Sequence, residues 1–296
     1  MELPSISIIN FSSLKTPEVQ KTIRAVNRQV TQDFQSIWGS AYMLRLHGTG
    51  FKPANPQDLE DEPVRGEAVI YLIDEDFLDG ALGFHSLNAS EIPFGFVFVD
   101  TSPNWTVTFS HEVLELIIDP TVNLFVPGPD PRNPTNLVLH TYEVCDAVER
   151  SKYQIDGVTV SDFLTPSYFS VGDAPGTRND FLGVGVESFG VTSGSHLAFY
   201  DLSADEFVTV IATSDDGKTL EPMMTGESKK DERPTENNLE DAMTRFQKNS
   251  RAKQRSQFRT GLPGVSAITR TGRYAAAAGC MKTHTLPTKI PAGLKG

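Results

Sequence analysis

Three residues that commonly do chemistry together, His111, Glu112 and Glu115, fall within five consecutive positions. On an α-helix, residues four apart share one face and are separated by roughly 6 Å along the axis, so the side chains of His111 and Glu115 can reach one metal ion. A carboxylate beside such a pair can take a proton from a water at the ion. The spacing therefore predicts a metal site with Glu112 as its general base.

The helix that must position these residues is apolar on its other faces, through Val113, Leu114 and 116–118. Such a helix is expected to run through a core. Buried charges need compensation, so His111, Glu112 and Glu115 require either a metal or a private hydrogen-bond network. Asp119-Pro120 should end the helix, because proline cannot continue it.

The segment His111-Glu112-Val113-Leu114-Glu115 resembles the His-Glu-x-x-His helix of the zincin metallopeptidases. In that superfamily two histidines bind zinc and the glutamate is the general base. Glu115 stands here in place of the second histidine. A carboxylate can bind zinc, but it lowers the net charge of the site and leaves other divalent metals open.

A catalytic zinc usually has three protein ligands, which directs attention to His140–Glu149. If this segment is helical, His140, Glu143 and Asp146 share one face. The segment resembles the second helix of the glutamate-type zincins. That resemblance implies Glu143 as the third metal ligand and Asp146 as the partner that orients His111. The alternative for Glu143, Asp146 and Glu149 is a solvated helix face, and His140 is expected to be a structural histidine.

The resemblance further implies a tyrosine or histidine that donates to the oxyanion. Tyr153, Tyr168 and His196 are the available donors, and Tyr153 comes first because it is nearest to Glu143 in sequence. Cys145 is expected to be a buried structural cysteine, since apolar and acidic neighbours raise a thiol pKa.

The expected elements alternate between strands and helices in the first half of the chain. Period-two apolar runs predict strands at 5–11, 41–46, 67–74, 81–85 and 93–100, a stripe with period 3.6 predicts a helix over 16–38, and the metal-site helix follows residue 104. This order resembles the zincin catalytic domain, an α+β fold with a mixed twisted sheet, a backing helix and a metal-site helix. The stretches 48–66, 126–134 and 177–195 are expected to be loops, Asp156-Gly157 predicts a hairpin turn within 153–160, and strands are expected at 196–200 and 206–212.

Composition divides the chain. The formal net charge is −12, but eleven lysines and arginines and no acidic residue follow Asp241, so residues 1–241 carry −23. We expect a domain at 1–215, a polar linker at 216–236 and a basic, largely disordered tail at 237–296 with one amphipathic helix near 238–258. The acidic domain is a poor ligand for nucleic acid, while the tail suits an anionic partner.

Several classes of protein are not indicated. No stretch of about 18 apolar residues exists, and the N-terminus lacks the pattern of a secretory signal, so we expect a cytoplasmic protein or one exported without such a signal, with no membrane partner. Two cysteines do not form a disulfide framework. No Gly-x-Ser-x-Gly elbow, phosphate loop or EF-hand loop is present.

The sequence therefore predicts a zinc peptidase that acts on a protein or peptide substrate, with His111, Glu115 and Glu143 as ligands of Zn²⁺. One alternative is a non-catalytic zincin-like protein that serves binding or assembly and carries a degenerate metal site. Another is nucleic-acid association through residues 242–296 alone.

Overall fold

The computed structural model describes residues 3–47, 68–74, 81–88, 91–100, 102 and 104–223. Within this part, helices and sheets together confirm the expected α+β class. The elements in the first half are β1 (Ser5–Asn10), α1 (Thr16–Arg28), the π-helical η1 (Gln29–Phe34), α2 (Gln35–Trp38), β2 (Met43–His47), β3 (Ala68–Ile73), β4 (Gly83–Leu87), β5 (Pro93–Phe98) and α3 (Trp105–Ile118). The second half contains β6 (Phe125–Asp130), β7 (Asn133–Thr141), the 3₁₀ turn η3 (Asp146–Val148), β8 (Lys152–Ile155), β9 (Val158–Ser161), β10 (His196–Asp201), β11 (Glu206–Ala212) and β12 (Leu220–Pro222).

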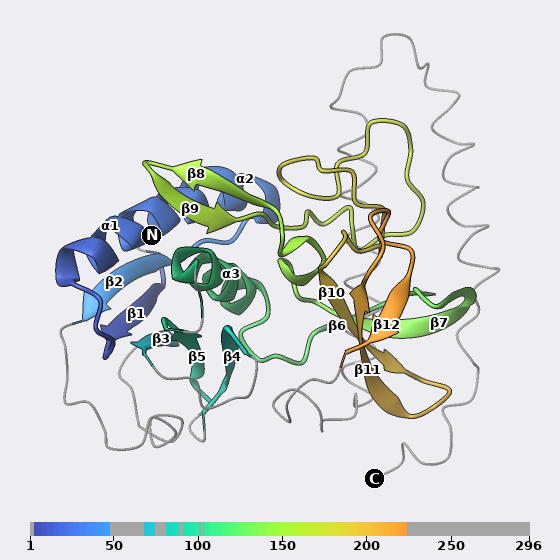
Figure 1. Cartoon of the computed structure of the whole chain (residues 1–296), viewed down its shortest axis with the longest axis horizontal. Coiled ribbons are helices and arrows are strands. Elements are labelled where there is room, and N and C mark those ends of the chain that lie inside the picture. Colours follow the sequence, from blue (N-terminus) through green and yellow to red (C-terminus); the bar gives the residue numbers. More distant parts are fainter. Residues whose placement is uncertain are drawn as a thin grey trace.

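The first sheet has the strand order β2-β1-β3-β5-β4. Strands β1, β2, β3 and β5 are parallel, whereas β4 pairs with β5 in the antiparallel sense and forms one edge. In Figure 1, α1 and α3 lie on the same side of this sheet. The side chains of β3 alternate between the two faces of the sheet. Ile70 and Leu72 belong to the main core with the helices, and Tyr71 packs with phenylalanines on the opposite face.

The backing helix forms where its apolar stripe predicts, but its middle is π-helical over Gln29–Phe34. Pro17 lies in its first turn, where proline costs no hydrogen bond. Gly39 ends the run with φ 77°, a left-handed conformation that glycine adopts without strain. Val26, Val30 and Phe34 are fully buried along this stripe.

The second sheet is antiparallel, with the order β12-β11-β10-β7-β6, and it corrects two expectations. The proline-rich stretch 126–134, expected to be a loop, largely forms β6 and the start of β7. Pro127 and Pro129 are tolerated because β6 is an edge strand, where a missing N–H leaves no gap in a ladder. β12 likewise occupies part of the expected linker.

The expected helix at His140–Glu149 is wrong. His140 lies in β7, opposite Val126 of β6 and Phe199 of β10, and only Asp146–Val148 makes a short helical turn. The three-residue spacing of His140, Glu143 and Asp146 therefore does not place them on one helix face, because pairing on both sides of β7 outweighs the local pattern at His140.

The expected hairpin is confirmed as β8 and β9. Its turn residues Asp156 and Gly157 both have positive φ, 51° and 72°, as a two-residue turn between twisted strands requires. Strands β10 and β11 also form where they are expected.

Two buried aspartates, Asp162 and Asp180, stabilise the long segment 162–195, which contains no helix or strand. Asp162 accepts hydrogen bonds from the N–H groups of Phe163 and Leu182, and Asp180 accepts one from Val184. Burial and the neighbouring Asp180 carboxyl raise the pKa of Asp162 to about 7. The two side chains therefore form a carboxyl pair that favours one retained proton.

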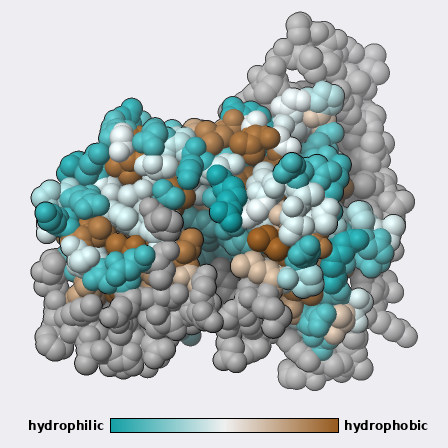
Figure 2. Space-filling model, in the orientation of Figure 1, coloured by the Kyte–Doolittle hydropathy of each residue, from teal (hydrophilic) through white to brown (hydrophobic). Residues whose placement is uncertain are grey.

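Residues 224–296 lie outside the described part of the chain, so the expected basic tail and the helix near 238–258 do too, as does the expected loop at 48–66. Among the described helices, none is long and apolar enough to cross a membrane. On the face drawn in Figure 2, hydrophilic residues predominate and hydrophobic ones form small separate patches.

Candidate metal centre

Helix α3 brings His111 and Glu115 together as their spacing predicts. His111 Nε2 lies 3.1 Å from Glu115 Oε2. The remaining faces of α3 are buried, with Val113, Leu114 and Leu116 at most 1% exposed. The packing of this helix therefore fixes the pair at the edge of the core.

Asp146, from the short turn after β7, contacts the same histidine nitrogen. Its Oδ1 lies 3.1 Å from His111 Nε2, and its Oδ2 lies 3.2 Å from His196 Nε2 at the start of β10. Glu149 Oε2 in turn lies 3.3 Å from His196 Nδ1. A chain of alternating acids and imidazoles thus runs from α3 to β10. Asp146 thus contacts His111, as the resemblance implies, and it does so at the nitrogen that also faces Glu115.

The outer end of this chain is open to solvent. The side chain of His111 is 14% exposed and that of His196 is 22% exposed, whereas Glu115 is 1% exposed. The imidazoles of His111 and His196 are therefore the parts of this chain that reach solvent, and Glu115 lies behind them.

The close approach of these groups perturbs their protonation. Burial disfavours a charged His111, but Glu115 and Asp146 outweigh burial and raise the pKa of His111 well above its usual value. Burial and the Asp146 carboxylate raise the pKa of Glu115 to about 7, although His111 opposes this shift. His196 behaves like His111: burial lowers its pKa, and Asp146 and Glu149 bring it to about 10. These raised pKa values favour the protonated forms of His111, Glu115 and His196 beside the carboxylates.

A second set of polar side chains lies deeper, around His85 of β4. His85 Nδ1 lies 3.2 Å from Glu112 Oε2 and 3.9 Å from Glu115 Oε2, and its Nε2 lies 3.8 Å from Glu143 Oε2. The side chain of His85 has no exposed surface. Glu112 is thus held on the inner side of α3 by an imidazole, and Glu115 lies between the inner and outer sets.

Asp119, just after α3, extends the inner set. Its carboxylate accepts hydrogen bonds from the N–H groups of Asn123 and Leu124. Burial and Glu143 raise the pKa of Asp119 to about 6, although His85 opposes this shift. The C-terminal end of α3 therefore adds a further buried carboxylate beside Glu143 and His85.

Gly83 allows β4 to lie this close to α3. A Cβ at Gly83 would stand 2.8 Å from the carbonyl oxygen of Phe96, 2.9 Å from Thr108 Cγ2 and 3.0 Å from Glu112 Oε1. These separations are too short for a side chain, so glycine is required for the close approach that places Glu112 beside His85.

The sequence pattern did not identify His85, because it lies 26 residues before His111 in a separate strand. The only sequence signal for His85 as a site residue was an imidazole in an otherwise apolar run, and a histidine in such a run more often has a structural role than a functional one. Its part in the site depends on β4 pairing next to the strand that precedes α3, which is a tertiary feature.

The structure places two other predicted site residues as follows. Glu143 contacts His85 in the inner set, and its charge also acts on the buried Glu115. The hydroxyl of Tyr153 donates to Asp33 Oδ2 in the π-helical segment at 2.8 Å, so it is not available as an oxyanion donor.

The remaining donors are also engaged. The hydroxyl of Tyr168 donates to the carbonyl oxygen of Gly190, and both ring nitrogens of His196 face carboxylates. His140 is a buried structural histidine, as expected, with Nε2 bonded to the Pro129 carbonyl and a pKa that burial lowers to about 4.

The donor set fits a divalent cation. In the described part of the chain, two groups of three side chains bring potential ligand atoms within 4.8 Å of one another: His111, Glu115 and Cys145 on the outer side, and His85, Glu112 and Glu115 on the inner side. Imidazole nitrogen, carboxylate oxygen and thiolate sulfur are the ligands that zinc takes in proteins. Glu143 and Asp146 belong to neither group.

Comparison with models of known protein families gives no match, and comparison with curated proteins gives none either.

Proposed function

We propose that this chain is a metal-dependent peptidase of the zincin-like type, in which His111 and Glu115 hold a divalent ion, most suitably Zn²⁺. The observation that carries the proposal is the 3.1 Å approach of an imidazole nitrogen and a carboxylate oxygen, one helical turn apart, with further acidic groups around them. A cation at that position would take the place of the protons that His111 and Glu115 favour because of their raised pKa values.

When bound, such an ion polarises a carbonyl group and lowers the pKa of a water molecule to about 7. Glu112 is the residue of this chain suited to take the proton from the attacking water and to pass it to the leaving amine. His85 keeps the Glu112 carboxylate in place through the 3.2 Å contact with Oε2.

The arrangement of the first sheet supports a peptide substrate. In the described residues β4 is one of the two edge strands of this sheet, and it lies directly against α3. An extended peptide can bind by pairing with an edge strand, which would bring its backbone next to the metal helix. The mixed sheet with α1 and α3 on one side also resembles the catalytic domain of zincins (Figure 1).

The test uses the full chain loaded with Zn²⁺ and a mixture of fluorogenic peptides. Glu112→Gln keeps the size of the side chain and its contact with His85 but removes the base. We expect hydrolysis to fall about 10²- to 10⁴-fold, the usual contribution of general acid–base catalysis, while bound zinc stays unchanged. The matched control is Glu187→Gln, an exposed glutamate in the irregular segment, which should leave both readouts as they are.

Turnover that survives in Glu112→Gln would remove Glu112 from the mechanism. A wild-type chain that binds zinc but hydrolyses none of the peptides would favour the alternative of a non-catalytic binding or assembly protein. A chain that binds no zinc would contradict the proposal as a whole.

A further inference from the structure

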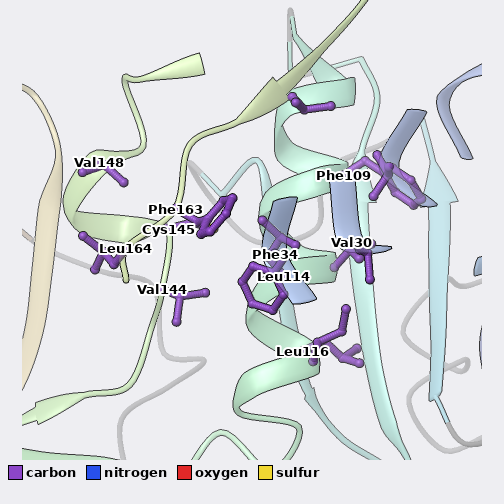
Figure 3. Packing of buried hydrophobic residues seen from close by; sticks show 14 of the residues in the cluster. Val30, Phe34, Phe109, Leu114, Leu116, Val144, Cys145, Val148, Phe163 and Leu164 are labelled. Atoms are coloured by element: carbon purple, nitrogen blue, oxygen red, sulfur yellow. The ribbon is translucent and has the colours of Figure 1, made fainter. Parts of the chain in front are cut away.

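Cys145 lies on the segment between β7 and the turn Asp146–Val148, which runs beside α3. Its side chain is fully buried. Figure 3 shows this segment, with Val144, Cys145 and Val148, next to α3 with Leu114 and Leu116. The position of Cys145 is therefore set by the packing of the main core.

Two contacts fasten Cys145 to the His111–Glu115 pair. The N–H of Cys145 donates to Glu115 Oε1 at 3.0 Å, so one oxygen of this carboxylate is anchored to residue 145 and the other faces His111 Nε2. The thiol points at the backbone carbonyl of His111, with Sγ 3.9 Å from that oxygen. Residue 145 thus contacts both ends of the helical turn that carries the pair.

The sulfur is also within reach of an ion. The ligand atoms of His111, Glu115 and Cys145 lie within 4.8 Å of one another. Donor atoms on a tetrahedral zinc, with bonds of about 2.0 to 2.3 Å, are roughly 3.3 to 3.8 Å apart, so a small inward movement would complete the site. Asp146 approaches His111 as closely, but it does not form a group of three with His111 and Glu115.

We propose that Cys145 is the third protein ligand of the metal, bound as a thiolate beside His111 and Glu115. This inference rests on the proposed metal site and specifies its coordination. The thiol loses its proton to solvent when the ion binds. The N–H of Cys145 that donates to Glu115 then orients a neighbouring ligand, as partners just outside a coordination sphere do.

A thiolate ligand has a consequence for the choice of metal. Sulfur ligands favour zinc over hard cations such as Mg²⁺, Ca²⁺ and Mn²⁺, which prefer oxygen. Without the thiolate, the His111–Glu115 pair with its acidic neighbours would suit the oxygen-preferring ions equally well. Cys145 therefore makes the centre selective for zinc.

The experiment is cobalt substitution of the full chain. Co²⁺ takes the ligands of zinc, and a thiolate bound to it gives an intense charge-transfer absorption in the near ultraviolet that nitrogen and oxygen ligands do not give. Cys280, the only other cysteine of the chain, lies outside the described residues, and Cys280→Ser leaves Cys145 as the sole thiol. We expect the band in the wild type, its persistence in Cys280→Ser and its loss in Cys145→Ser.

We further expect Cys145→Ser to weaken Co²⁺ binding beyond the roughly 10- to 100-fold loss typical of a residue that only orients a ligand. The Cys280→Ser spectrum assigns the band in a chain that keeps Cys145, so the test does not depend on Cys145→Ser folding. Visible d–d bands without the charge-transfer band in Cys280→Ser would overturn Cys145 as a ligand and leave the metal site itself intact. No uptake of Co²⁺ by the wild type would overturn both proposals.

Discussion

Replacing Glu115 by glutamine should stabilise the metal-free protein at alkaline pH while abolishing its response to metal. Burial and Asp146 raise the pKa of Glu115 from its ordinary 4.5 to about 7. Because the folded-state pKa exceeds the unfolded one, the stability that the protonated group contributes is present below about pH 4.5 and is lost as the pH rises through 7.

The size of the effect follows from the shift. Each pKa unit corresponds to 1.36 kcal/mol, so about 2.5 units amount to ~3 kcal/mol at pH 8. Glutamine is neutral, has the same shape and still accepts the N–H of Cys145 at Oε1. Glu115→Gln should therefore raise the free energy of unfolding by up to ~3 kcal/mol at pH 8, with the gain shrinking toward zero near pH 4.5.

Urea unfolding in the presence of a chelator, at pH 5 and at pH 8, measures this difference. The control is Glu206→Gln, an exposed residue of β11, which should change the unfolding free energy little at either pH. Added Zn²⁺ should then stabilise the wild type and leave Glu115→Gln unchanged. A glutamine variant that is less stable than the wild type at pH 8, or a gain of equal size at both pH values, would refute the reasoning.

Three further predictions concern the framework of the site. Asp162→Asn should stabilise the protein at pH 8 more than at pH 4, because its amide can donate to the buried Asp180 carboxylate; chemical unfolding at both pH values measures this. Gly83→Ala should destabilise the fold by about 1 to 3 kcal/mol and weaken catalysis, because the added methyl group overlaps Phe96 and Glu112. Urea unfolding measures the loss of stability, and peptide turnover measures the loss of activity. Burial lowers the pKa of His140 to about 4, so the free energy of unfolding of the wild type should fall by ~3 kcal/mol between pH 6.5 and 4. His140→Gln should reduce this fall, as measured by urea unfolding at both pH values.

Local signals were sufficient for much of the first sheet and for α3. The spacing of His111 and Glu115 on an apolar helix, the stop at Asp119-Pro120 and the Asp156-Gly157 turn are encoded within a few residues, and each appears as predicted. Propensity and periodicity act over such short distances, which explains this success.

The remaining parts of the site depend on pairing between distant segments. The stretch 140–149 has the spacing of a helix, but its first two residues belong to β7, which pairs on both sides, and its helical part is only the short turn Asp146–Val148. This moves Glu143 toward His85 and leaves Cys145 and Asp146 beside His111. No local pattern indicates that His85 of β4 would face Glu112 of α3, because that contact arises from strand order and from the missing side chain of Gly83.

The central claim is that His111 and Glu115 hold a metal ion, and elemental analysis of the purified full chain tests it most directly. After exposure to Zn²⁺ and exhaustive dialysis, we expect about one equivalent of zinc in the wild type and none in His111→Ala. His47→Ala, which alters a histidine at the end of β2, serves as the control and should retain the ion. A wild-type chain without stoichiometric metal, or a His111→Ala chain that keeps it, would contradict this account.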